Sequence, residues 1–63
     1  MKEQEAIDQA YQATLAGLFN VFFSSYTAAK GDAAGEQQAE EHFQKGILHA
    51  RHVYSRAIDL LAQ

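Results

Sequence analysis

A single cluster of helix-breaking residues, KGDAAGE at positions 30–36, divides this 63-residue sequence into two long segments, and neither segment contains proline. Both segments are rich in residues that favour helix. Gly31 suits the left-handed conformation that ends many helices, and Asp32 can cap the free amides of a following one. The sequence therefore predicts an all-α fold, a two-helix antiparallel hairpin in a single domain, 1–63, with helices over about 3–29 and 33–62 and a loop over about 30–34.

The chain is short for a self-sufficient fold. A protein of this size buries only about 60% of the surface that its unfolded chain exposes. Below roughly 70–80 residues, small proteins usually add disulfides, a metal or a second subunit to one core. The sequence has no cysteine, which excludes disulfides and Cys-based zinc sites. We therefore expect self-association or a partner chain.

The run from Gln9 to Ala29 holds no charged residue and contains LFNVFF at positions 18–23. At 100° per residue, one broad stripe of the first predicted helix carries Ile7, Tyr11, Leu15, Leu18, Val21, Phe22, Ser25 and Ala29. Phe19, Phe23 and Tyr26 fall well to one side of that stripe. The apolar arc is wider than one neighbouring helix can cover, so part of it is expected to face another chain.

The second predicted helix has a seam of smaller residues, consisting of Ala39, Phe43, Gly46, Ala50, Ala57 and Leu61. Small side chains let another helix approach closely. Two such hairpins that paired their surplus apolar surfaces would form a homodimeric four-helix bundle. The residues expected at this dimer or partner interface are Leu15, Leu18, Phe19, Phe22, Phe23, Tyr26, Phe43, Ala50, Tyr54 and Ala57.

Charge is distributed unevenly along the chain. Residues 1–41 carry two lysines against seven acids, whereas residues 42–63 carry three basic residues against one acid. In a hairpin the two ends lie together, so Glu5 and Asp8 can face Arg56 or its neighbours. Lys45, His49, His52 and Arg56 also form a possible anion-binding stripe, because all four fall within about 60° on a helix. This stripe offers an alternative function as a nucleic-acid-binding regulator, although the net charge of −3 makes nucleic acid an unlikely partner.

No catalytic, cofactor-binding or metal-binding residue is predicted. His49 and His52 lie one turn apart, but Lys45 and Arg56 place fixed cations where a metal needs anionic ligands. A metal held across a dimer axis by the histidines stays open. His42 is interpreted as a half-buried structural histidine. Glycines are scattered rather than gathered in a phosphate-binding loop, and no G-x-S-x-G motif is present. No cofactor is expected, and the chain is interpreted as a non-enzyme.

The sequence thus favours a small non-enzymatic interaction or structural protein that acts as a homodimer, with another protein as a possible further partner. Leu48, which points away from the seam of the second helix, and Phe23, at the edge of the stripe on the first, are candidate contacts for such a partner. A second alternative is a small chaperone or partner subunit that covers a client helix with its Leu18–Phe23 face. The acidic first turns are unlike a secretory signal, and polar residues interrupt the uncharged run, so a cytoplasmic location without membrane contact is expected.

Overall fold

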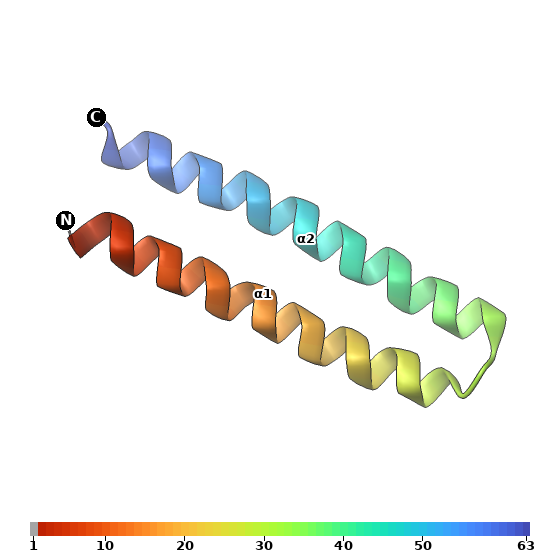
Figure 1. Ribbon diagram of the computed structural model, residues 1–63. Helices are drawn as coiled ribbons and strands as arrows, with labels where there is room; N and C mark the ends of the chain where they lie inside the picture. Colours follow the sequence, from red (N-terminus) through yellow and green to blue (C-terminus); the bar gives the residue numbers. More distant parts are fainter. Residues whose placement is uncertain (1) are drawn as a thin grey trace.

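A computed structural model describes residues 2–63 and contains two antiparallel helices joined by a short loop. Helix α1 spans Lys2–Ala29 and helix α2 spans Ala33–Leu61. The two helices lie side by side along their whole length, and both chain ends lie at the same end of the molecule (Figure 1). The predicted all-α helical hairpin is therefore confirmed. Neither helix is long and apolar enough to cross a membrane, among the residues described.

The connection between the helices is as tight as the breaker cluster predicts. Lys30 and Gly31 both adopt positive φ angles, 53° and 85° respectively, and so reverse the chain within two residues. Asp32 then caps α2, because its side chain accepts a hydrogen bond of 2.9 Å from the amide of Gly35. A Cβ atom on Gly35 would lie 3.1 Å from Cβ of Ala29, so the missing side chain lets the helices close near the loop. The tight turn, the Asp32 cap and the close approach at Gly35 together determine the antiparallel arrangement of the helices.

The contact line between the helices is narrow. Of residues 2–63, only Ala39 and Ala50 are buried, at 6% and 8% exposure. The larger seam residues are half-buried, and they are Ile7, Tyr11, Leu15, Leu18, Phe22, Phe43, Ile47, Tyr54 and Ile58. Val21, Ser25 and Leu61, which were expected on the seam, are exposed instead. Two helices meet along a single line, so side chains well to either side of that line reach solvent.

The result is a flat and elongated molecule. Its Cα trace measures 47 × 16 × 7 Å, with a radius of gyration of 14.8 Å, where a compact chain of this length has about 11 Å. The accessible surface is 4908 Å², compared with about 4,000 Å² for a compact protein of the same mass. A single hairpin therefore leaves an unusually large part of its surface exposed.

Candidate functional site: the two faces of the hairpin

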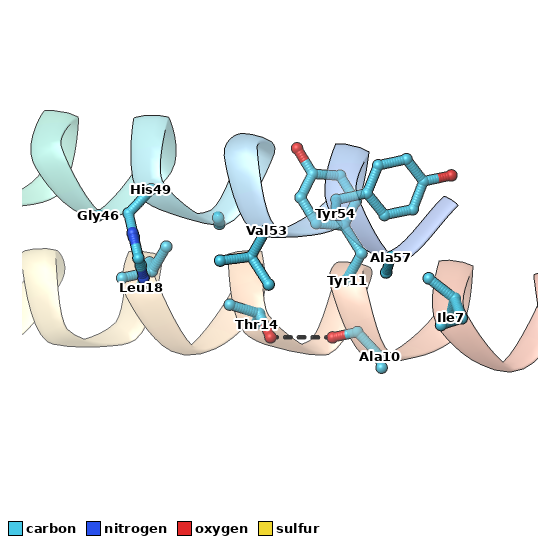
Figure 2. A pocket seen from close by; sticks show the side chains of 11 residues that line it. Ile7, Ala10, Tyr11, Thr14, Leu18, Gly46, His49, Val53, Tyr54 and Ala57 are labelled. Carbon is cyan, nitrogen blue, oxygen red and sulfur yellow. Dashed lines mark hydrogen bonds between the residues drawn. The ribbon is translucent and has the colours of Figure 1, made fainter. Parts of the chain in front are cut away.

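The single layer of two helices has two broad faces, one on each side of the seam. One of them, here called the groove face, contains an open hollow of about 470 Å³ that runs along the half of the hairpin nearer the termini (Figure 2). Both helices line the hollow, and its residues are Ile7, Ala10, Tyr11, Thr14, Leu18, Gly46, His49, Ala50, Val53, Tyr54 and Ala57. Nearly all of these side chains are apolar. The hollow is thus suited to an apolar surface rather than to a polar ligand.

Small residues account for the shape of the groove face. Thr14 turns its hydroxyl back onto its own helix, where it donates a hydrogen bond of 3.0 Å to the carbonyl of Ala10 (Figure 2). Leu18 packs over Gly46, and a Cβ atom at position 46 would lie 2.7 Å from Cδ2 of Leu18. Ala50 is buried beneath the floor of the hollow. The helices therefore approach closely here, and few large side chains rise above them.

The opposite side, here called the aromatic face, is built from larger side chains. Its residues are Leu15, Phe19, Phe22, Phe23, Tyr26, Phe43, Ile47 and Leu48. Helical position places the first seven on one side of the hairpin, and Leu48 lines a shallow hollow there with Phe43 and Ile47. The rings of Phe22 and Phe43 stack across the seam with centroids 4.8 Å apart. Phe22 also contacts Tyr26, at 5.5 Å, and Phe19 contacts Phe23, at 6.2 Å. The rings thus form two groups on the loop half of the molecule, Phe22 with Phe43 and Tyr26, and Phe19 with Phe23.

Several members of the aromatic face are more exposed than such side chains usually are in a folded protein. Phe19 is 52% exposed, and Phe23 and Leu48 are each 61% exposed. Large apolar side chains gathered on one face, rather than scattered singly, are typical of an interaction surface. Leu48 and Phe23, the two candidate partner contacts, therefore lie on the same face as the aromatic cluster.

Charged side chains flank the aromatic face at two heights. Glu36 and Glu40 lie beside Tyr26 near the loop. The pKa of the Tyr26 phenol is raised, most strongly by the negative charge of Glu36, then by partial burial and then by the charge of Glu40. Glu41 accepts a hydrogen bond of 3.3 Å from Gln37 on the same helix. Arg51 lies nearer the termini and lines a shallow hollow with Phe43 and Leu48. Acids thus border one end of this apolar surface, and a cation borders the other.

A polar contact closes the seam near the chain ends. The hydroxyl of Tyr54 donates a hydrogen bond to Oδ1 of Asp8, and the ring of Tyr54 lies 4.5 Å from that of Tyr11. This hydrogen bond, followed by partial burial, raises the pKa of Tyr54. Sequence reasoning did not anticipate this contact, although matching positions across the hairpin could have suggested it. The contact ties the two helices together far from the loop.

Asp8 contacts Tyr54, a near neighbour of Arg56, and forms no ion pair with Arg56 itself. Arg56 instead lies 3.7 Å from Asp59 on its own helix, and both side chains are more than half exposed. Asp8 lies on the seam, whereas Arg56 lies on the outer side of α2, turned away from α1. An exposed pair one turn apart contributes little to stability. An ion pair between Asp8 and Arg56 therefore does not explain the uneven distribution of charge along the sequence.

The remaining predicted residues fall into separate places. Leu18, Ala50, Tyr54 and Ala57 line the groove face, and the other six predicted interface residues lie on the aromatic face. The members of the possible anion-binding stripe, Lys45, His49, His52 and Arg56, are all exposed along α2. His42 is also exposed, which overturns its interpretation as a half-buried histidine. Within residues 2–63, no three His, Asp or Glu side chains are grouped as a metal ion requires.

No family model, no curated protein and no solved structure matches this chain. The chemistry of its two faces is therefore the basis for a functional conclusion. Apolar side chains with large exposed areas dominate that chemistry. Such surfaces bind other macromolecules by excluding water from the contact.

Proposed function

We propose that this chain is a small non-enzymatic interaction protein that acts as a homodimer, in which two hairpins stack face to face as a four-helix bundle. The observation that carries the proposal is the mismatch between exposed and buried apolar surface. Among the residues that the structure describes, eight large hydrophobic side chains are 37% exposed or more, while only two alanines are buried. A small fold that leaves this much apolar surface in water is only marginally stable by itself.

The dimensions of the hairpin support a second copy as the partner. A layer 47 Å long and 16 Å wide presents about 750 Å² on each face, close to the roughly 800 Å² per partner that stable interfaces bury. Two stacked layers would also give the molecule the two-layer architecture that soluble domains normally need. A closed twofold dimer is the commonest arrangement of identical chains. One face of the hairpin is thus sufficient for a stable dimer.

The proposal is tested by placing a polar side chain on each face and measuring the dimer dissociation constant by sedimentation equilibrium. Phe23 on the aromatic face and Leu60, which follows Val53 by seven residues on the groove side of α2, provide a matched pair, with 61% and 56% exposure. Phe23→Ser removes a large apolar contact twice per dimer, so it should raise the dissociation constant about a thousandfold. Leu60→Ser should change it less than threefold.

Three outcomes are informative. A weakened dimer for Phe23→Ser alone supports the proposal. Equal dissociation constants for both variants and the wild type would exclude the aromatic face as the dimer interface. A wild-type chain that is monomeric and poorly helical would contradict the proposal and would favour a different chain as partner, as in a small chaperone that covers a client helix. Helicity measured by circular dichroism distinguishes dissociation from unfolding in each case.

A further inference from the structure

The aromatic face carries charges of both signs at heights that match under a half-turn of the hairpin. We infer that the second copy lies on this face with its loop at the opposite end, so that Arg51 of each copy meets Glu40 and Glu41 of the other. This inference rests on the proposed homodimer and specifies its geometry. It is carried by the positions of the charged and apolar side chains along the two helices.

Contacts between the helices show which residues of α1 and α2 lie at the same height, that is, at the same position along the long axis of the hairpin. Phe22 stacks on Phe43, Tyr11 on Tyr54, and Leu18 packs over Gly46. Residue 19 of α1 therefore lies level with residues 45 and 46 of α2. Phe19 is the exposed aromatic side chain at this height. A twofold axis in the plane of the interface at this height would place Phe19 opposite its own copy.

The apolar side chains of α1 are arranged symmetrically about that height. Leu15 and Phe23 lie four residues before and after Phe19. When two copies stack with opposite directions, α1 lies on α1, and Leu15 of one copy meets Phe23 of the other. Leu15 is half-buried and Phe23 is exposed, so a smaller side chain receives a projecting ring.

The apolar side chains of α2 follow the same symmetry. Phe43 and Leu48 lie almost equally far on either side of the level of residues 45 and 46. The half-turn therefore brings Leu48, which is 61% exposed, over Phe43 of the second copy. Phe43 separates two shallow hollows on this face, one lined with Leu48 and Arg51 and the other with Glu40 and Glu41. Leu48 of each copy is thus placed against the hollow beside Phe43 of the other copy.

The charges complete the match. Arg51 and Glu40 lie five to six residues on either side of the same level, and both are exposed. Within one chain they are separated by eleven residues of helix, about 16 Å, which exceeds the range of unscreened attraction between exposed charges. The half-turn places Arg51 of one copy at the height of Glu40 and Glu41 of the other, twice per dimer. The charges thus gain partners of opposite sign only in this register.

Two other arrangements lack this complementarity. If the loops lay at the same end, each α1 would lie on α2 of the other copy, and Arg51 would meet the uncharged stretch that begins at Gln9. Glu40 and Glu41 would then lie against Phe23. The outer side of α2 next to the groove face carries Lys45 and Arg56, and α1 of a second copy stacked on the groove face would offer them no acid between residues 9 and 29.

Charge reversal in mixed dimers tests the register. Arg51→Glu should weaken the homodimer about thirtyfold, because two attractive contacts become repulsive. The double variant Glu40→Arg/Glu41→Arg should weaken its own homodimer similarly. A mixture of these two variants restores opposite charges at both contacts, so the heterodimer should be at least tenfold tighter than either variant homodimer. Native mass spectrometry of the mixture measures the species present, and Lys45→Glu, an equal change of charge on the outer side of α2, should leave the homodimer unchanged.

Disulfide trapping gives a second readout that does not depend on charge, since the chain has no other cysteine. Phe19→Cys should cross-link to its own copy under oxidising conditions, whereas Lys45→Cys, at the same height on the outer side, should not. Heterodimer preference together with cross-linking at position 19 is the expected result. If the wild type is a dimer but the charge variants show no heterodimer preference and Phe19→Cys does not cross-link, this register is overturned and the proposed homodimer is not. A monomeric wild type would overturn both proposals.

Discussion

The groove face and the aromatic face share the same two helices but differ in the size of the side chains that border the seam. On the groove face, Gly46 and Thr14 keep the surface low, and Leu18 closes over the gap. On the aromatic face, Phe22 and Phe43 stack across the seam, and Phe19 and Phe23 project beyond it. The comparison indicates that one side of the hairpin allows close helix approach, while the other carries the exposed aromatic rings.

The largest expected effect is on the side chain that connects the seam to the aromatic face. Phe22→Ala removes the ring contacts to Phe43 and Tyr26, and it should lower the free energy of unfolding by about 3 kcal/mol. Leu18→Ala on the groove face should cost about 2 kcal/mol, because Leu18 has fewer large partners. Urea titrations at one fixed protein concentration measure both. An equal or larger loss for Leu18→Ala would remove the distinction between the faces.

The loop serves both faces equally, so its capping residue should affect stability without favouring either face. Asp32→Ala removes the side-chain acceptor for the amide of Gly35 and should lower the free energy of unfolding by about 1 kcal/mol. The cross-linking yield of Phe19→Cys should be the same with and without this change. A loss of cross-linking in a chain that stays helical would show that the loop also controls how the copies meet.

Alkaline pH should weaken contacts on both sides of the seam. The pKa values of Tyr26 and Tyr54 are raised above the ordinary value of 10.0, Tyr26 mainly by the charge of Glu36 and Tyr54 mainly by its hydrogen bond to Asp8. A raised pKa means that folding favours the protonated phenol. This stabilisation is fully present below pH 10 and is lost as the pH rises through the folded-state pKa values.

The measurement is the free energy of unfolding at several pH values from about 9 to 11.5. The wild type should lose stability over this range, and the double variant Tyr26→Phe/Tyr54→Phe should lose less. Tyr54→Phe should also be slightly less stable than the wild type near neutral pH, because Asp8 loses its donor. The same alkaline loss in the double variant and the wild type would contradict the assigned contacts.

The smallest effect is expected on the groove face. Val53 is 50% exposed beside the hollow, so Val53→Ser should change both the free energy of unfolding and the dimer dissociation constant only slightly, by less than about 0.5 kcal/mol. Thermal unfolding and sedimentation equilibrium measure the two quantities. A large increase in the dissociation constant would place the dimer interface on the groove face instead.

Local chemistry made the hairpin predictable from the sequence. The breaker cluster at 30–36 located the turn, Gly31 adopts the left-handed conformation expected of it, and Asp32 caps α2. Compared with Lys2–Ala29 and Ala33–Leu61, the predicted helices, about 3–29 and 33–62, differ by one residue at the start of the first helix and at the end of the second. These features depend on neighbours within a few residues, which a sequence displays directly.

Contacts across the seam were harder to predict. Helical periodicity places apolar residues on a broad arc, but it does not show how narrow the line of contact between two helices is. Val21 and Leu61 were therefore expected on the seam, and both are exposed. The pairing of Asp8 with Tyr54 rather than Arg56 depends on side-chain direction as well as height. The division of the ten expected interface residues between two faces likewise required the relative rotation of the helices.

The solution mass of the wild-type chain over a dilution series, with helicity followed in parallel, tests the central claim most directly. The account predicts a helical species of twice the chain mass of 7.0 kDa, which dissociates and loses helix together on dilution because the aromatic face becomes exposed. A chain that stays fully helical as a monomer at all concentrations would contradict it, since the hairpin would then be stable with its aromatic face in water.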